Sequence, residues 1–172
     1  MLQVNHIRDL HLFDVFDEIC EPDEQYDGER AITEAGGLEF SQGRMNSVKG
    51  IYNNPILGGS GNIDDVRQLL VRQIQFPQKN LHIHQGWFQD TIPKVAPKIS
   101  SIAMLRLDAD LYASTKIAME YLYPKLANKG IIIIDDYGAY EGCKKAIDDY
   151  LKNNELYPFI CHLDHECIYW IK

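Results

Sequence analysis

A run of four isoleucines, Ile131–Ile134, restricts the fold of this chain more than any other feature. Four β-branched residues with no polar residue between them are typical of a strand in a parallel sheet, which is covered on both faces. Such a sheet needs strands that alternate with helices along the chain. The sequence has this alternation, because three further apolar runs predict strands and three segments with helical periodicity predict helices. The predicted strands are Leu10–Phe13, Leu81–His84 and Ser101–Leu107, and the predicted helices begin near Asn62, Ser114 and Cys143.

Local signals add detail to these elements. Asn62 is a predicted helix N-cap with Asp65 three residues later, and Gly130 stands where a C-cap glycine would end the helix from Ser114. The expected inward face of that helix consists of Ile117, Ala118, Tyr121 and Leu122. The apolar runs Phe159–Leu163 and Cys167–Ile171 predict a closing antiparallel hairpin. The predicted fold class is α/β, with a mostly parallel sheet and a C-terminal antiparallel hairpin.

The charge balance excludes several classes of partner. Lysine and arginine total 17 against 25 acidic residues, which gives a net charge of −8 and a pI near 5.2. A protein that binds nucleic acid through its phosphates needs a basic face, and so does a helix on an anionic membrane. The isoleucine run is the longest aliphatic stretch and is far too short to span a membrane. We therefore expect neither a nucleic acid nor a membrane as a partner.

Length and cysteine usage predict one cytoplasmic domain, residues 1–172. The four cysteines form no CxxC pair, so we expect reduced thiols, and no apolar segment at the start predicts a signal peptide. Residues 21–61 hold 8 of the 12 glycines and show little periodicity, which predicts a loop or lid inserted into the domain. Within it, Gly58-Gly59-Ser60-Gly61 lacks the spacing of a phosphate-binding loop and is interpreted as a flexible connector.

Carboxylates follow the predicted strands, and ligands of open α/β sheets bind beyond the carboxyl ends of strands. Asp14 follows the first strand, where an acid accepts hydrogen bonds from a ribose or else begins a turn. Asp108 and Asp110 follow the third strand, and Asp135 and Asp136 follow the isoleucine strand. Carboxylates packed this closely repel one another, and Mg²⁺, which prefers oxygen ligands, relieves the repulsion. The alternative is that these pairs are helix caps or solvated strand ends.

Two groups of histidines invite a zinc interpretation. By alternation His82 and His84 share one face of a strand, but no third ligand at a useful spacing is evident, so we interpret them as ordinary strand histidines. His162 and His165 lie near cysteines and acids of the terminal turn, at a spacing that fits no familiar zinc site. The sequence therefore predicts no zinc site in either place.

Longer motifs give a resemblance to a known family. The stretch LRLDADLYAST (105–115) resembles the LRLDGDLYEST signature of the macrocin O-methyltransferase (TylF-type) family, and GWFQDTIP (86–93) looks like its GWFxDTLP. YPKL (123–126) and IIDDYG (133–138) are similar to its YPKL…IVDDYG, and CKKAIDDY (143–150) to its CRxAVDDF. The end, LDHECIYW (163–170), resembles the closing IDWxxxYW, and DVFD (14–17) is a looser match to DSFEG. The motifs occur in the family's order along the chain.

The resemblance implies a Rossmann-like methyltransferase fold that uses S-adenosylmethionine and Mg²⁺. Family substrates are hydroxyl groups, typically on sugars of secondary metabolites or other glycosides, so the implied partner is a small hydroxyl acceptor. Carried over by position, Asp14 would hold the ribose hydroxyls of the cofactor. Three residues of the GWFQDTIP motif would border the adenine side: Gly86, Trp87 and Asp90.

The resemblance also implies roles for the four carboxylates. Asp108, Asp135 and Asp136 would ligate Mg²⁺, and Asp110 would be the general base. These roles agree with the chemistry of methyl transfer to an alcohol, which is a poor nucleophile at neutral pH. A metal that binds the hydroxyl lowers its pKa, and an adjacent carboxylate can take the proton as the new C–O bond forms.

One departure from the family pattern concerns the start of the chain. Family members have a first strand with an acidic, glycine-rich loop upstream of the DSFEG-like segment, but only 13 residues precede Asp14 and none is glycine. The predicted fold is therefore an N-terminally truncated, partial methyltransferase domain. A sheet without its first strand has an unpaired edge, which favours a homo-oligomer. The alternative function is a non-catalytic methyltransferase-like chain that acts as a binding module or is an inactive remnant.

Overall fold

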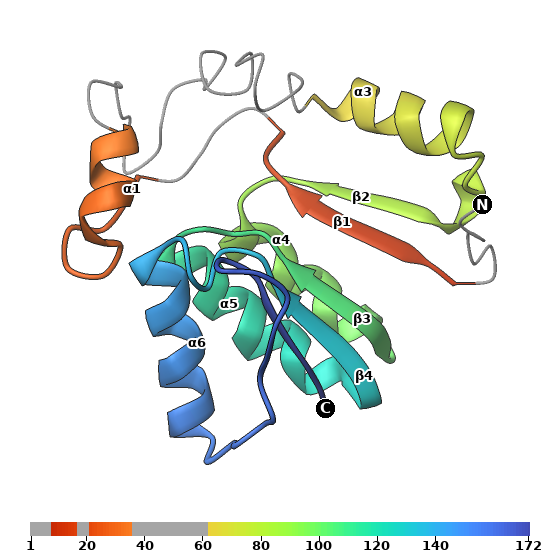
Figure 1. Ribbon diagram of the computed structural model, residues 1–172. Coiled ribbons are helices and arrows are strands. Elements are labelled where there is room, and N and C mark those ends of the chain that lie inside the picture. The colour runs from red at the N-terminus through yellow and green to blue at the C-terminus, as the bar shows by residue number, and fades with distance from the viewer. Residues whose placement is uncertain (1–7, 17–20, 36–61) are drawn as a thin grey trace. The chain divides into compact units, whose positions relative to one another are not determined.

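The computed structural model describes residues 8–16, 21–35 and 62–172. These fall into two compact units (Figure 1). The first contains residues 8–16 and 62–87, and the second contains residues 21–35 and 88–172. The predicted connector at Gly58–Gly61 lies outside the described residues.

The first unit contains two parallel strands and one helical segment. Strand β1 (Leu10–Asp14) pairs with β2 (Leu81–Gln85) in a register that places Leu10 opposite Leu81, so both predicted strands are confirmed. Asn62 caps the helical segment as predicted, because its side chain accepts hydrogen bonds from the backbone N–H groups of Asp64 and Asp65. This segment consists of α3 (Ile63–Arg67), the π-helical η1 (Gln68–Gln73) and, before β2, the 3₁₀ turn η2 (Gln78–Asn80).

The second unit contains a four-stranded sheet in the order β3-β4-β6-β5. Strand β3 (Ile102–Leu107) runs parallel to β4 (Leu126–Ile134), whose other edge pairs antiparallel with β6 (Ile168–Ile171). Strand β5 (Cys161–His162) completes the terminal hairpin with β6. The mixed α/β sheet and its closing hairpin are confirmed, and the isoleucines occupy a central strand as expected.

Helices of the second unit pack around α5 (Tyr112–Leu122), which contacts α6 (Glu141–Asn153), α4 (Phe88–Val95) and β3 (Figure 1). Short 3₁₀ turns follow two of these helices: η3 (Ala96–Lys98) and η4 (Tyr123–Lys125). The core includes five large side chains that are at most 1% exposed: Met119, Ile132, Ile134, Ile147 and Trp170. Helix and sheet thus share one apolar interior.

Two details of the α5 region differ from the sequence-based prediction. The helix begins at Tyr112, and its buried face includes Thr115 and Met119, whereas Tyr121 is 40% exposed. Gly130 is not a helix cap. The helix ends at Leu122 because Pro124, which has no N–H to donate, continues the chain as a 3₁₀ turn. Gly130 lies within β4, where its carbonyl accepts a hydrogen bond from the Lys172 N–H at 2.9 Å.

Part of the segment predicted as a loop is helical. Helix α1 (Gly28–Ala35) begins at Gly28, whose φ of +73° suits glycine, and buries Ala31. Its eight residues are too short for a clear periodic signal in a glycine-rich and acid-rich surrounding. Contacts with α5 and α6 therefore decide its structure, as described below. No helix within the described ranges is long and apolar enough to cross a membrane.

Candidate functional site

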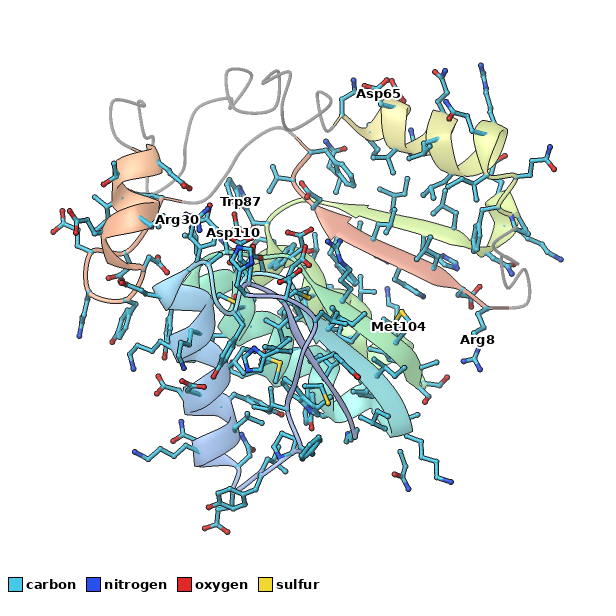
Figure 2. The ribbon with its side chains drawn as sticks, in the orientation of Figure 1. Arg8, Arg30, Asp65, Trp87, Met104 and Asp110 are labelled. Carbon is cyan, nitrogen blue, oxygen red and sulfur yellow. The ribbon has the colours of Figure 1, made fainter. Side chains whose placement is uncertain are left out.

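The ends of β3 and β4 bring acidic residues together. Leu107 pairs with Ile134, so the residues after each strand emerge at the same edge of the sheet. Carboxylate oxygens of Asp108, Asp110 and Asp136 lie within 4.8 Å of one another, and we call these three residues the carboxylate cluster (Figure 2 labels Asp110). Three of the four carboxylates that the sequence predicted at this edge are therefore neighbours in space.

Backbone geometry holds Asp110 in the cluster. Its φ of +54° lies in the left-handed region, which is uncommon for a residue with a side chain. Asp136 stabilises this turn, because its Oδ2 accepts hydrogen bonds from the N–H groups of Ala109 at 3.2 Å and Asp110 at 3.4 Å. The carbonyl of Asp110 accepts a further bond from the N–H of Cys143 at 3.1 Å, near the start of α6. Strained backbone of this kind is concentrated at functional sites.

The cluster has unusual electrostatics. Burial, together with the negative charge of Asp136, raises the pKa of Asp110 to about 8. Burial also raises the pKa of Asp136. Near neutral pH, Asp110 therefore keeps its proton and donates it in a hydrogen bond to the Asp136 carboxylate. A bound cation would remove the reason for this protonation, since it offsets the repulsion between the carboxylates.

Asp135, the fourth carboxylate, has a different partner. It accepts a hydrogen bond from the guanidinium of Arg106, which also lies 2.9 Å from Oδ2 of Asp108. The sequence analysis did not single out Arg106. The two-residue spacing between Arg106 and Asp108 could have indicated this contact, because residues two apart in an extended chain point to the same side.

A buried acid outside the cluster was also missed. Asp27 is 2% exposed, and its carboxylate accepts hydrogen bonds from the N–H of Tyr112 at 2.5 Å and that of Asp23 at 2.7 Å. It therefore caps the first turn of α5, directly after the Asp110 turn. A methyl group on Gly142 of α6 would lie 1.9 Å from Asp27 Oδ1, so only glycine allows this approach. The segment before α1 is thus fixed to the start of both helices.

Helix α1 also contacts the turn before α6. The hydroxyl of Tyr140 donates to Glu34 at 2.5 Å, and the Arg30 guanidinium lies 4.6 Å from the centre of the Tyr140 ring. Arg30 in addition donates to the carbonyl of Ala139 at 3.2 Å. The negative charge of Glu34 contributes to the raised pKa of Asp110, so α1 belongs to the electrostatic surroundings of the cluster.

The residues predicted to bind the cofactor are divided between the two units. In the first unit the Gly86 N–H donates to the carbonyl of Asp14 at 2.9 Å, and Trp87 follows and is buried. Oδ1 of Asp14 accepts a hydrogen bond from the N–H of Phe16 at 2.5 Å, which makes a tight turn after β1. Asp90 is exposed in the first turn of α4 and belongs to the second unit.

Comparisons with known proteins agree with the resemblance seen in the sequence. The chain is 35% identical over 136 residues to demethyldecarbamoylnovobiocin O-methyltransferase from Streptomyces niveus, a match of 79% of this chain and 47% of the relative. It is 42% identical over 85 residues to a tetracenomycin-C 4'-O-methyltransferase from Streptomyces olivaceus, which covers 49% of this chain and 31% of that protein. The chain thus spans about half the length, or less, of these relatives.

Solved methyltransferase structures are similar to this chain in fold. The O-methyltransferase NovP superposes with a TM-score of 0.71 at 27% identity, over 96% of this chain and 60% of that one. The calicheamicin methyltransferase CalS11, at 19% identity, has a TM-score of 0.63 over 97% of this chain and 61% of that one. Both similarities confirm the Rossmann-like methyltransferase fold. The sequence model of the family described as Macrocin-O-methyltransferase (TylF) matches residues 1–172, and the chain belongs to this family.

Proposed function

We propose that this chain carries the site for Mg²⁺-assisted O-methylation, from S-adenosylmethionine to a hydroxyl group on a sugar or a glycosylated secondary metabolite. The observation that carries the proposal is the carboxylate cluster, in which a half-buried Asp110 with a pKa of about 8 adjoins Asp108 and Asp136. Such a pKa is unusual for an aspartate, and perturbed carboxyl groups at the ends of parallel strands are typical of active sites.

The donor set fits a hard divalent cation. Carboxylate oxygens are the ligands that Mg²⁺ prefers, and Mg²⁺ leaves positions free for water or a substrate oxygen. We assign Asp108 and Asp136 as ligands from the cluster and Asp135 as a third, which would exchange its contact with Arg106 for the cation. When bound, S-adenosylmethionine supplies an electrophilic methyl group and Mg²⁺ supplies a Lewis acid for the acceptor hydroxyl.

Asp110 is assigned as the general base. A carboxylate is most useful as a base when its pKa lies near the working pH, and that of Asp110 is raised to about 8. Bound S-adenosylmethionine would supply the methyl group, with its sulfur as the leaving group, and this chain would supply the base for the acceptor hydroxyl. The hydroxyl proton passes to the carboxylate of Asp110, which balances the charge of the transfer.

The cofactor side of the proposal rests on the turn after β1. Asp14 would accept hydrogen bonds from the ribose hydroxyls, an assignment that rests on its place at the carboxyl end of β1. The assignment of Gly86, Trp87 and Asp90 to the adenine side rests on the GWFQDTIP motif alone. The acceptor class is suggested by relatives, one of which is described as acting on a rhamnosyl tetracenomycin.

Titration of the purified chain with S-adenosylhomocysteine, with and without Mg²⁺, tests the proposal. We expect calorimetric binding in the wild type and a loss of at least about tenfold in Asp14→Asn, the size expected for a lost hydrogen bond to a charged group. The matched control is Asp64→Asn, because the Asp64 side chain is 86% exposed and pairs only weakly with Arg67. Methyl transfer to a rhamnoside, followed by mass spectrometry, then tests the acceptor class.

Uptake of Mg²⁺ without binding of S-adenosylhomocysteine would contradict the assignment for this chain. It would favour the alternative of a non-catalytic module that keeps the carboxylate cluster.

A further inference from the structure

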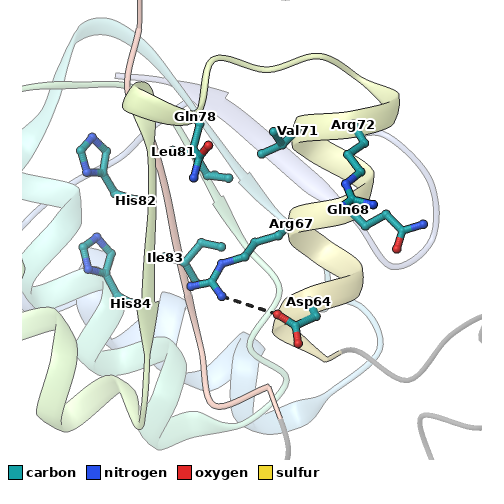
Figure 3. A pocket seen from close by; sticks show the side chains of 10 residues that line it. All are labelled: Asp64, Arg67, Gln68, Val71, Arg72, Gln78, Leu81, His82, Ile83 and His84. Atoms are coloured by element: carbon teal, nitrogen blue, oxygen red, sulfur yellow. Dashed lines mark ion pairs between the residues drawn. The ribbon is translucent and has the colours of Figure 1, made fainter.

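The two-stranded sheet of the first unit carries ionisable rings on one face. The parallel register places His11 opposite His82 and Phe13 opposite His84. Alternation directs Leu81 and Ile83 to the other face, where a cavity of about 750 Å³ lies between β2 and the helical segment. Figure 3 shows these two apolar side chains directed toward the helical segment and both histidines directed away from it.

The imidazole rings on this face are close together and nearly parallel. The ring centres of His11 and His82 are 4.6 Å apart at an interplanar angle of 17°. Nδ1 of His11 lies 3.0 Å from Nε2 of His84, which is hydrogen-bond distance. Asp9 adds a carboxylate, with Oδ1 3.3 Å from Nε2 of His82.

One nitrogen in this group lacks a hydrogen bond. Nε2 of His82 is shielded from solvent and forms no well-aligned hydrogen bond with any residue in the described part of the chain, although Asp9 is near. Ligand atoms of Asp9, His11 and His82 lie within 4.8 Å of one another. A shielded nitrogen without a hydrogen bond, near a carboxylate and a second imidazole, belongs to a donor set that a metal ion would complete.

We propose that Asp9, His11 and His82 bind a transition-metal ion of the Zn²⁺ type, independently of the carboxylate cluster. Two imidazoles and one carboxylate are a known zinc donor set, and three protein ligands leave a position for water. His84 is assigned as a positioning residue: in the tautomer of His11 that carries its proton on Nδ1, His84 Nε2 accepts that proton at 3.0 Å, and the other ring nitrogen of His11 would bind the metal.

The proposed site differs from the interpretation of His82 and His84 as ordinary strand histidines. That interpretation depended on the lack of a third ligand at a useful spacing along the chain. The structure supplies further candidates from β1 and the residue before it, 71 positions upstream in the case of His11. Ligands that come from a neighbouring parallel strand leave no local spacing pattern.

The donor chemistry favours zinc over Mg²⁺ at this face. Imidazole nitrogen suits Zn²⁺, Co²⁺ and Ni²⁺, whereas Mg²⁺ prefers oxygen. A saturating Mg²⁺ background therefore occupies the carboxylate cluster and leaves the histidine face available.

Titration with Co²⁺ in excess Mg²⁺ tests the proposal through visible absorption, and calorimetry with Zn²⁺ gives the stoichiometry. We expect one strong site in the wild type, with a loss of at least about tenfold in affinity in His11→Gln and in His82→Gln, and a smaller loss in His84→Gln. The matched control is His165→Gln, because the His165 side chain is 88% exposed and lies outside this group.

Equal affinity in His82→Gln and the control would overturn the proposal, as would the absence of a Co²⁺ spectrum in the wild type. A folding defect is separated from ligand loss by Asp9→Asn, which removes an exposed ligand without touching the core, and by circular dichroism of each variant without metal. If Asp9→Asn binds Co²⁺ like the wild type, Asp9 is not a ligand and the proposed set is wrong.

Discussion

The carboxylate cluster of the second unit and the histidine group of the first unit are each built at parallel strands, but they differ in chemistry. The cluster consists of three acids, in which the burial of Asp110 and the repulsion from its neighbours raise the pKa of Asp110 and keep its proton in place. In the histidine group, burial and the adjacent His82 lower the pKa of His11, which favours the neutral ring. One group thus holds excess negative charge, whereas the other offers imidazole nitrogens and a single carboxylate.

The difference teaches that the residue type decides which ion each group can hold, even where the strand geometry is similar. Oxygen ligands with excess charge select Mg²⁺, and imidazole nitrogens select Zn²⁺ and its neighbours. The position relative to the strand also differs. The acids follow the carboxyl ends of β3 and β4, where α/β enzymes place their sites, while the histidines lie within β1 and β2.

The largest expected effect concerns Asp110. Asp110→Asn should lower the rate of methyl transfer about 10²–10⁴-fold, because an amide cannot accept the hydroxyl proton. Single-turnover mass spectrometry of the methylated product measures the rate, with His82→Gln as the control from the other group. A variant as active as the wild type would show that Asp110 is not the base.

Mg²⁺ should stabilise the chain through the cluster alone. At 100 times its Kd, a ligand specific for the folded state contributes about 2.7 kcal/mol. In a chain of this size that is a rise of about 5–10 °C in Tm. The rise, followed by circular dichroism, should be largely lost in Asp136→Asn and retained in His82→Gln. A loss in both variants would mean that the two groups are not independent.

Substitution of two acids of the second unit, the buried Asp27 and the half-buried Asp110, should change the free energy of unfolding in opposite directions. Asp27→Ala leaves the N–H groups of Tyr112 and Asp23 without their acceptor, which should lower the free energy of unfolding by about 1–3 kcal/mol. Asp110→Asn instead removes a carboxyl group from the cluster of repelling acids. In the absence of metal this substitution should raise the free energy of unfolding. Urea unfolding at pH 8 measures both, and equal signs would contradict the electrostatic description of the cluster.

The advantage of Asp110→Asn should depend on pH. The pKa of Asp110 is raised from 3.8 to about 8, so the folded chain retains a proton that the unfolded chain releases. This contribution to stability is complete below about pH 4 and is lost as the pH rises through about 8. Without metal, the stability of the variant relative to wild type should therefore increase between pH 5 and pH 9 by about 4 kcal/mol, since about three pH units lie between pH 5 and the raised pKa. A constant difference across this range would contradict the raised pKa.

The smallest effect is expected for Arg106. Arg106→Gln removes the positive charge beside Asp108 and Asp135, which should tighten Mg²⁺ binding about two- to fivefold, since exposed ion pairs contribute little. Zn²⁺ binding at the histidine group should not change. Calorimetry with each metal measures both, and weaker Mg²⁺ binding would show that Arg106 supports the site rather than competing with the cation.

Much of the fold was predictable because its signals are local. The β-branched run at Ile131–Ile134, the N-cap at Asn62 and the apolar runs of the terminal hairpin each specify an element from a few adjacent residues. The prediction was wrong where contacts between residues far apart in the sequence surround an element. Helix α1 follows Asp27, whose carboxylate accepts a hydrogen bond from the start of α5, and no residue near α1 in sequence indicates that partner.

The candidate site was likewise predictable from the sequence only in part. The sequence alone determined the family and the acids at the strand ends, because the strand pattern and the motifs both occupy continuous stretches. Only the tertiary structure decided that Asp110 joins Asp108 and Asp136 while Asp135 pairs with Arg106, and that His11 lies opposite His82. The physical reason is that such neighbours depend on backbone turns and strand register. Residues far apart in the chain meet only after the strands have paired.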